Sequence, residues 1–268
     1  MSESSFDQTR LTIGLVQARL FWQLPAPNRD HLAMLMDQSP GCDLYVLPET
    51  FSTGFLGDQG QPAEPIDGPT VQWMKDQSLQ RKAAIAGSLA LEVDGARRNR
   101  FLFVDGGEIV AFYDKRHLFS YGGEDQRYLA GDVPCVFEWR GWRIDLQICY
   151  DLRFPVWCRN DRAFDLQLFV ANWPSPRVLA WQRLLQARAI ENQAAVVGVN
   201  RVGEDGKGIA YPGCSSAWSA LGECLVEIGP GESVGRVTLD LADIRALRER
   251  LPFLADADRF QIMPSAGE

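Results

Sequence analysis

Three side chains with complementary chemistry, Glu49, Lys115 and Cys149, each stand just past a segment with the pattern of a β-strand. Strand ends are where α/β sheets collect their active sites. A thiol with an ordinary pKa of about 8.5 is mostly protonated at neutral pH, so a catalytic cysteine needs a base or a nearby cation. Glu49 could be the base, and Lys115 could favour the thiolate and stabilise an oxyanion. The pattern therefore predicts a cysteine nucleophile.

Each of these residues also has a plain structural interpretation. A free cysteine after a strand is usually a small buried hydrophobe, Glu49 could open a loop, and Lys115 could be a solvated charge beside Asp114. The flanking sequence favours the catalytic interpretation, because it is distinctive at all three sites. The segments are Leu-Pro-Glu at 47–49, Asp-Lys-Arg-His-Leu-Phe at 114–119 and Cys-Tyr-Asp-Leu-Arg-Phe-Pro at 149–155.

Composition narrows the class of protein. The 268 residues are 46% hydrophobic and 23% charged, which is ordinary for a globular protein, and the formal net charge of -8 argues against nucleic acid as a partner. The chain shows neither a signal peptide nor a stretch that approaches a membrane span. Its six cysteines lack paired spacing, and its two histidines leave little material for a metal site. We therefore expect a cytoplasmic protein with reduced thiols, bound neither to a membrane nor to a metal.

The elements that must position the three side chains alternate between strands and helices. We expect helices at 27–38, 68–82 and 176–191, and strands at 11–17, 44–47, 84–90, 100–104, 108–113, 142–148, 166–170, 195–200 and 236–239, with a further hairpin within 215–227. Asp145 and Gln147 are unusual polar residues for a strand of a buried sheet. Neither a repeat nor a linker interrupts the chain, which favours one domain over residues 11–260 after a disordered or extended tail at 1–10.

At these segments the chain resembles the nitrilase superfamily of carbon-nitrogen hydrolases, whose Glu-Lys-Cys triad falls in this order within motifs of this form. It is similar in particular to the omega-amidase branch and its bacterial YafV-like members, through the sequences at 53–55, 115–119, 171–174, 187–193 and 256–260. The resemblance implies an α/β fold, the four-layer α-β-β-α sandwich of the nitrilase type. It also implies a homodimer that uses neither a metal nor an organic cofactor.

The resemblance carries the catalytic roles to Glu49, Lys115 and Cys149, and it makes Glu124 a candidate for a second, structural glutamate. In the expected cycle, Glu49 takes the thiol proton of Cys149, and the thiolate attacks a primary amide carbon. Lys115 and the backbone N–H of Tyr150 then hold the oxyanion. Ammonia leaves, and a water that Glu49 deprotonates hydrolyses the thioester intermediate.

Short dicarboxylic acid monoamides, such as 2-oxoglutaramate or 2-oxosuccinamate, are the expected small-molecule substrates. Arg153 lies four residues after Cys149, and its planar guanidinium suits the distant carboxylate. The resemblance also places Trp173 in the substrate pocket. The alternative for Arg153 is an ion pair with Asp151 or Asp161 that braces the turn.

Other functions stay open on the sequence alone. The same triad could act on another amide, a nitrile, an N-carbamoyl compound or deaminated glutathione. His117 permits a cysteine-histidine hydrolase, and a non-catalytic binding protein could share the fold. The chain also departs from the family pattern at Val156, where Glu is usual, and at Cys214, where Asp is expected. Both departures bear on the substrate pocket rather than on the triad.

Overall fold

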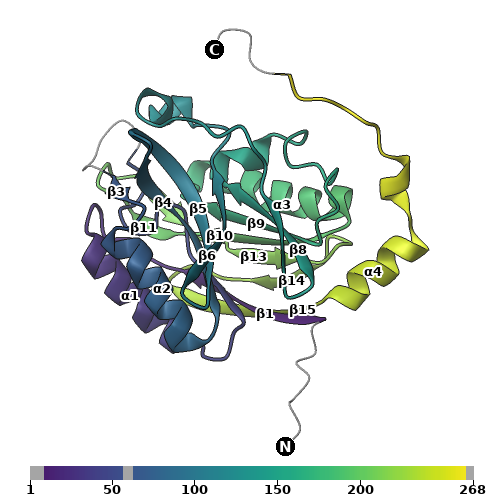
Figure 1. Cartoon of the computed structure of the whole chain (residues 1–268), viewed down its shortest axis with the longest axis horizontal. Helices are drawn as coiled ribbons and strands as arrows, with labels where there is room; N and C mark the ends of the chain where they lie inside the picture. The colour runs from purple at the N-terminus through teal and green to yellow at the C-terminus, as the bar shows by residue number, and fades with distance from the viewer. Residues whose placement is uncertain (1–8, 57–62, 264–268) are drawn as a thin grey trace, which may run out of the picture.

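The computed structural model describes residues 9–56 and 63–263 of the chain. Two β-sheets pack face to face, with helices on both outer surfaces (Figure 1). Helices α1 (Pro25–Asp37) and α2 (Pro69–Arg81) cover the outer face of the first sheet, and α3 (Val178–Asn192) covers that of the second. This four-layer α-β-β-α sandwich confirms the predicted fold class.

Both sheets mix parallel and antiparallel strands. The first has the order β15 (Ser233–Asp240), β1 (Arg10–Gln17), β2 (Leu44–Val46), β4 (Ala84–Val93), β5 (Ala96–Asp105) and β6 (Glu108–Asp114), with β3 (Glu64–Pro65) paired to β4. The second has the order β14 (Cys224–Glu227), β13 (Ser216–Trp218), β10 (Ala195–Asn200), β9 (Leu166–Ala171), β8 (Trp142–Ile148) and β7 (Val136–Trp139). Strands β11 (Val202–Glu204) and β12 (Ala210–Pro212) form a separate pair.

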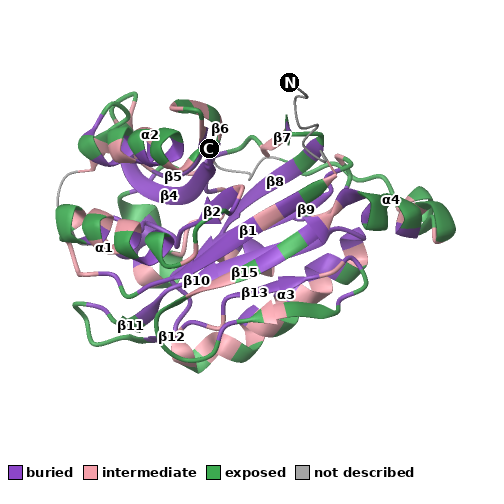
Figure 2. Ribbon diagram, turned by 90° about the horizontal axis from the view of Figure 1, so that it is seen from below, coloured by how far each residue is buried: buried purple, intermediate pink, exposed green. Residues whose placement is uncertain are grey.

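The apolar core forms two clusters (Figure 2). One fills the space between the sheets and continues beneath α3, and the other lies beneath the helices of the first sheet. Ile13 of β1 and Leu146 of β8 belong to the layer between the sheets, and both are fully buried. Leu32, Leu35 and Met36 form the buried face of α1, as their helical spacing predicts. Burial of these faces fixes the strands whose ends carry the candidate residues.

The polar residues of β8 lie on the face that turns toward α3. Gln147 pairs with Phe169 and Phe169 with Gly198, which packs against α3. The amide Nε2 atoms of Gln147 and Gln167 donate to Asp145 Oδ2 at 2.9 and 2.7 Å. Burial raises the pKa of Asp145 to about 7, against the opposing effect of these hydrogen bonds. The two unusual residues therefore form a buried cluster with an amide from the neighbouring strand.

Several elements differ from expectation for local reasons. The predicted helix at 176–191 begins at Val178, because Ser175–Arg177 forms a 3-10 turn, η4. The sequence pattern does not predict α4 (Leu241–Arg250), which buries only three residues, nor the short strands β3, β7, β11 and β12. Residues 1–8 of the predicted tail lie outside the described residues, and Arg10 already belongs to β1. In the described ranges no helix has the length and apolarity to cross a bilayer.

Candidate active site

A cavity of about 600 Å³ opens where β2, β6, β8 and β9 end. Strands β1, β2 and β4 are parallel, β6 runs in their direction because β5 is antiparallel to both of its neighbours, and β8, β9 and β10 are parallel. The lining includes six of the predicted site residues, namely Glu49, Lys115, Cys149, Tyr150, Arg153 and Trp173. The structure thus brings together residues from distant parts of the sequence.

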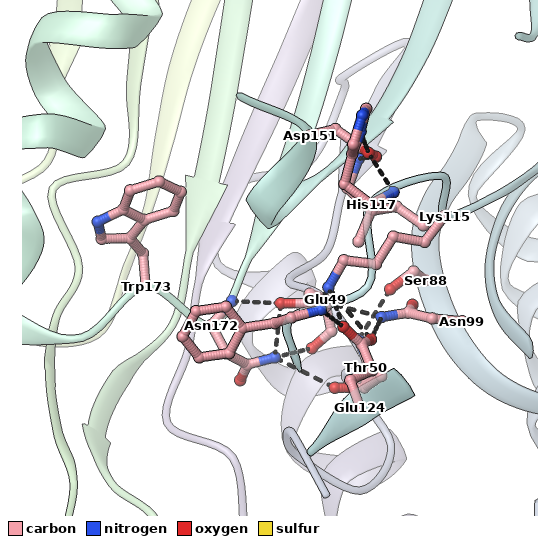
Figure 3. A network of polar contacts seen from close by, with 12 residues as sticks. Glu49, Thr50, Ser88, Asn99, Lys115, His117, Glu124, Asp151, Asn172 and Trp173 are labelled. Atoms are coloured by element: carbon pink, nitrogen blue, oxygen red, sulfur yellow. Dashed lines mark hydrogen bonds and ion pairs between the residues drawn. The ribbon is translucent and has the colours of Figure 1, made fainter. Parts of the chain in front are cut away.

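Glu49 follows β2 and is completely buried. Its Oε1 atom accepts hydrogen bonds from Lys115 Nζ at 2.8 Å and from Asn99 Nδ2 at 2.9 Å (Figure 3). Its Oε2 atom accepts from the backbone N–H of Asn172 at 2.8 Å. Burial alone would raise the pKa of the Glu49 carboxyl, but the Lys115 ammonium and these hydrogen bonds lower it below its ordinary value. The group is therefore held as a carboxylate.

Lys115 follows β6 and lies between two buried carboxylates. Its Nζ atom is 2.8 Å from Glu49 Oε1 and 2.8 Å from Glu124 Oε2. Asn99 donates to both glutamates, and the Phe119 N–H donates to Glu124 at 2.7 Å. Burial alone would lower the pKa of Lys115, but the two carboxylates raise it well above its ordinary value. Burial raises the pKa of Glu124, although Lys115 opposes this. The ammonium group therefore stays charged.

Cys149 follows β8 and opens the 3-10 turn η3 (Cys149–Arg153). Its φ of +46° is left-handed, a conformation that costs a non-glycine residue about 1 to 2 kcal/mol. The thiol hydrogen-bonds with the Glu49 carboxylate; burial and that negative charge raise its pKa well above its ordinary value, although Lys115 opposes this. The backbone N–H of Tyr150 is in the first turn and lacks an intrahelical acceptor. The resting thiol therefore keeps its proton beside a carboxylate that can accept it.

The Asp151 side chain joins the Cys149 turn to the loop after β6. It accepts hydrogen bonds from the backbone N–H groups of Ile148 and His117, each at 3.0 Å, and from the Tyr113 hydroxyl at 2.9 Å. The Nδ1 atom of the His117 ring lies 2.8 Å from Asp151 Oδ1 (Figure 3). The same ring stacks on Phe154. Among the described contacts none joins His117 to the thiol, which argues against the cysteine-histidine alternative.

Arg153 faces the cavity rather than a neighbouring acid. Its guanidinium lies over the Trp173 ring, 4.9 Å from the centroid. Asp151 pairs with His117, and Asp161 pairs with Arg162 at 3.0 Å. Within the described residues, the bracing ion pair considered for Arg153 is therefore absent.

Two asparagines and one arginine belong to the site without having been singled out by sequence pattern. Asn172 binds Glu49 through both its backbone and its side chain, Asn99 bridges the two glutamates, and Arg177 lines the cavity. The position of Asn172 directly after a strand is a usable signal for it. Asn99 and Arg177 have no comparable signal, because their partners come from other strands and loops.

The two departures from the family pattern lie away from the cavity. Val156 is 53% exposed, and neither it nor Cys214 is on the lining. Cys214 instead accepts a hydrogen bond from the Trp181 indole through its backbone carbonyl. In the described part of the chain, no group of three or more His, Cys, Asp or Glu side chains could hold a metal ion.

Comparison with known proteins shows the family of the chain. The carbon-nitrogen hydrolase family model matches residues 12–249. The chain is 45% identical to the omega-amidase YafV of Escherichia coli K12 over 94% of its own length and 98% of the relative. It is 32% identical to a 2-oxoglutaramate amidase of Bacillus subtilis, over 91% and 96% of the two chains.

Among solved structures, a carbon-nitrogen hydrolase superfamily protein from Xanthomonas campestris, which carries an arsenic adduct in its active site, matches with a TM-score of 0.92. That protein is 46% identical, and the match covers 95% of this chain and 99% of the other. Sequence and structure lead to the same conclusion: the chain belongs to the carbon-nitrogen hydrolase family.

Proposed function

We propose that the protein is an omega-amidase, which hydrolyses the distal amide of short dicarboxylic acid monoamides to the dicarboxylate and ammonia. The observation that carries the proposal is the contact of the Cys149 thiol with a carboxylate that is itself bound to a buried ammonium group. The similarity to an omega-amidase and to a 2-oxoglutaramate amidase supports the choice of substrate. 2-Oxoglutaramate and 2-oxosuccinamate are the proposed substrates.

The first half of the cycle forms a thioester. Glu49 accepts the thiol proton as the sulfur of Cys149 attacks the amide carbon. Because the pKa of Glu49 is lowered and that of the thiol is raised, the proton moves only as the carbon-sulfur bond forms. The oxyanion is held by Lys115 and the Tyr150 N–H. Glu49 then returns its proton to the nitrogen, the carbon-nitrogen bond breaks, and ammonia leaves.

The second half reuses the same groups. Glu49 removes a proton from a water that attacks the thioester carbon, and Lys115 again stabilises the oxyanion. The carbon-sulfur bond breaks, and the sulfur recovers the proton from Glu49. Glu124 and Asn99 are positioning residues, because they hold Lys115 and Glu49 in place and do not themselves line the cavity. One amide and one water thus give one acid and one ammonia.

Arg153 is proposed to bind the far carboxylate of the substrate, with Trp173 as the ring that supports it. A charge-assisted hydrogen bond of about 1.5 to 3 kcal/mol corresponds to roughly ten- to a hundredfold in kcat/KM. The test is the ratio of kcat/KM for 2-oxoglutaramate to that for a neutral amide of similar length, in the wild type and in Arg153→Met. The ratio should fall by that factor. If both substrates lose activity equally in a folded variant, the carboxylate site lies elsewhere.

The proposed setting is a homodimer in the cytoplasm. Helix α3 exposes Leu179 and Ile190, which are 64% and 51% accessible, and Leu221 is 52% accessible. Exposed apolar side chains on one helix and its neighbouring loop are consistent with an association surface. All six cysteines are free thiols, as expected in a reducing compartment. Sedimentation at micromolar concentration tests the dimer, and a monomer there would contradict it.

A further inference from the structure

Arg177 is a second guanidinium on the wall of the active-site cavity. It ends the turn η4, which follows the segment Asn-Trp-Pro at 172–174 after β9. Its guanidinium lies over the Phe119 ring, 5.4 Å from the centroid. The described residues supply it with neither a carboxylate nor a hydrogen-bond acceptor, and the same is true of Arg153.

Some buried arginines elsewhere in the chain, by contrast, pair with an acidic side chain. Arg100 pairs with Asp114 at 2.7 Å, and Arg188 pairs with Glu191 at 2.6 Å. The chain carries a formal net charge of -8, so acidic side chains are plentiful. Two guanidiniums without an acidic partner on one cavity wall therefore indicate that a ligand supplies the counter-charge.

The acids that line the same cavity are already engaged. Glu49 is bound to Lys115 and to Asn172. Asp205 accepts hydrogen bonds from the Tyr211 hydroxyl at 2.8 Å and from the backbone N–H of Ile209 at 3.0 Å. Within the described residues, neither carboxylate forms an ion pair with Arg153 or Arg177, so the wall around these two guanidiniums does not compensate their charge.

The two guanidiniums are also held in place relative to the reacting groups. Trp173, which carries Arg153 on its face, donates its indole N–H to the Arg177 carbonyl at 2.7 Å. Phe119, which carries Arg177, donates its backbone N–H to the Glu124 carboxylate that holds Lys115. A ring beneath each guanidinium leaves the N–H edges free to bind acceptors. The arrangement is preorganised for a ligand with two acceptor groups at its far end.

We infer that Arg177 is a specificity-determining residue, which forms with Arg153 a two-guanidinium site for the far end of the substrate. The inference rests on the proposed omega-amidase function. A 2-oxo acid presents both a carboxylate and a neighbouring carbonyl oxygen, and both accept hydrogen bonds. An amino acid amide such as glutamine presents an ammonium group at that carbon, which two nearby guanidiniums repel. The site therefore selects 2-oxo acid amides over amino acid amides of the same length.

The test compares 2-oxoglutaramate with glutamine, because the two differ only at the carbon next to the carboxylate. The measured quantity is the ratio of their kcat/KM values. Arg177→Met should lower this ratio about tenfold or more, and Arg177→Lys, which keeps the charge but loses the planar fork, should give an intermediate ratio. Arg183→Met is the matched control, since Arg183 is exposed on α3 and off the cavity lining. Its ratio should stay within about twofold of the wild type.

Calorimetric binding to the Cys149→Ala protein gives the same comparison without turnover. In that background, Arg177→Met should weaken the binding of 2-oxoglutaramate about tenfold more than the binding of glutamine. Equal losses for both ligands would overturn the inference and leave Arg177 as a support for Phe119. In the kinetic test, an unchanged ratio of the two kcat/KM values would overturn the inference as well. If the wild type hydrolyses neither compound, the proposed function fails, and this inference fails with it.

Discussion

Two buried carboxylates, Glu49 and Asp145, are equally inaccessible to solvent, and yet their pKa values are shifted in opposite directions. Glu49 binds an ammonium group and a backbone N–H, and its pKa lies below the ordinary value. Asp145 binds two neutral amides, and burial raises its pKa to about 7. The sign of the neighbouring charge, rather than burial, therefore decides which carboxylate can act as a base at neutral pH.

The cluster around Glu49 and the cluster around Asp145 also differ in position. Glu49 lies on the cavity lining in contact with the Cys149 thiol, whereas Asp145 lies on the α3 side of β8 and off that lining. A change at the first cluster should therefore alter turnover, and a change at the second should alter stability. The following predictions test that division.

The largest effect is expected for Cys149→Ala, which removes the proposed nucleophile beside Glu49. Turnover should fall by about a thousandfold or more, because among the described residues no other thiol lines the cavity. Thermal melting should show an intact fold, since the substitution removes only the sulfur atom of a side chain at the edge of the core. Near-wild-type activity in a folded variant would contradict the assignment of the nucleophile.

Lys115→Ala should be next, because it leaves two buried carboxylates without their cation. We expect kcat/KM to fall about a hundredfold or more, and the free energy of unfolding to fall by about 3 to 5 kcal/mol. Lys115→Arg should not restore activity, since a planar guanidinium cannot place a point charge between Glu49 and Glu124. Chemical denaturation and steady-state kinetics measure the two effects, and rescue by arginine would argue against the oxyanion role.

Asp145→Asn should act on stability alone. The folded protein keeps the Asp145 proton up to about pH 7, whereas the unfolded chain releases it near the ordinary value of 3.8. The wild type should therefore lose stability as the pH rises between these values, and the variant should lose about 1 to 3 kcal/mol less over the same range. Denaturation at pH 4 and pH 7 measures this. Parallel pH profiles would show that the cluster does not titrate.

His117→Asn should have the smallest effect. An asparagine amide can donate to Asp151 as the His117 ring does, and the ring makes no described contact with the thiol. Turnover should stay within about threefold of the wild type, with stability changed by about 1 kcal/mol. A hundredfold fall in kcat would instead support the cysteine-histidine mechanism.

The sequence was informative where chemistry depends on one residue at the end of one strand. Glu49, Lys115 and Cys149 were predicted in this way, because alternation located the strands, and the structure places the three residues on one cavity. Glu124 was identified by the family resemblance, and the structure places its carboxylate in contact with Lys115.

The remaining features depend on pairing between distant segments. Asn99 meets both glutamates only because β5 lies beside β4 and β6 in the sheet. One of the two amide partners of Asp145 is Gln167, which β9 supplies through its parallel register with β8. Arg177 reaches the cavity because η4 folds back after β9. Spacing along the chain carries none of these relations, so sequence pattern alone could not supply them.

The Asp151 carboxylate, which is bound by backbone groups next to both β6 and β8, also determines how these two strand ends unfold locally. It accepts the amide hydrogens of Ile148, at the end of β8, and of His117, in the loop after β6, and these strands belong to different sheets. A fluctuation that withdraws Asp151 frees both amides at once, so the two should exchange with deuterium at a common rate. The turn that begins at Cys149 and the loop that begins at Lys115 would then open as one cooperative unit across the two sheets.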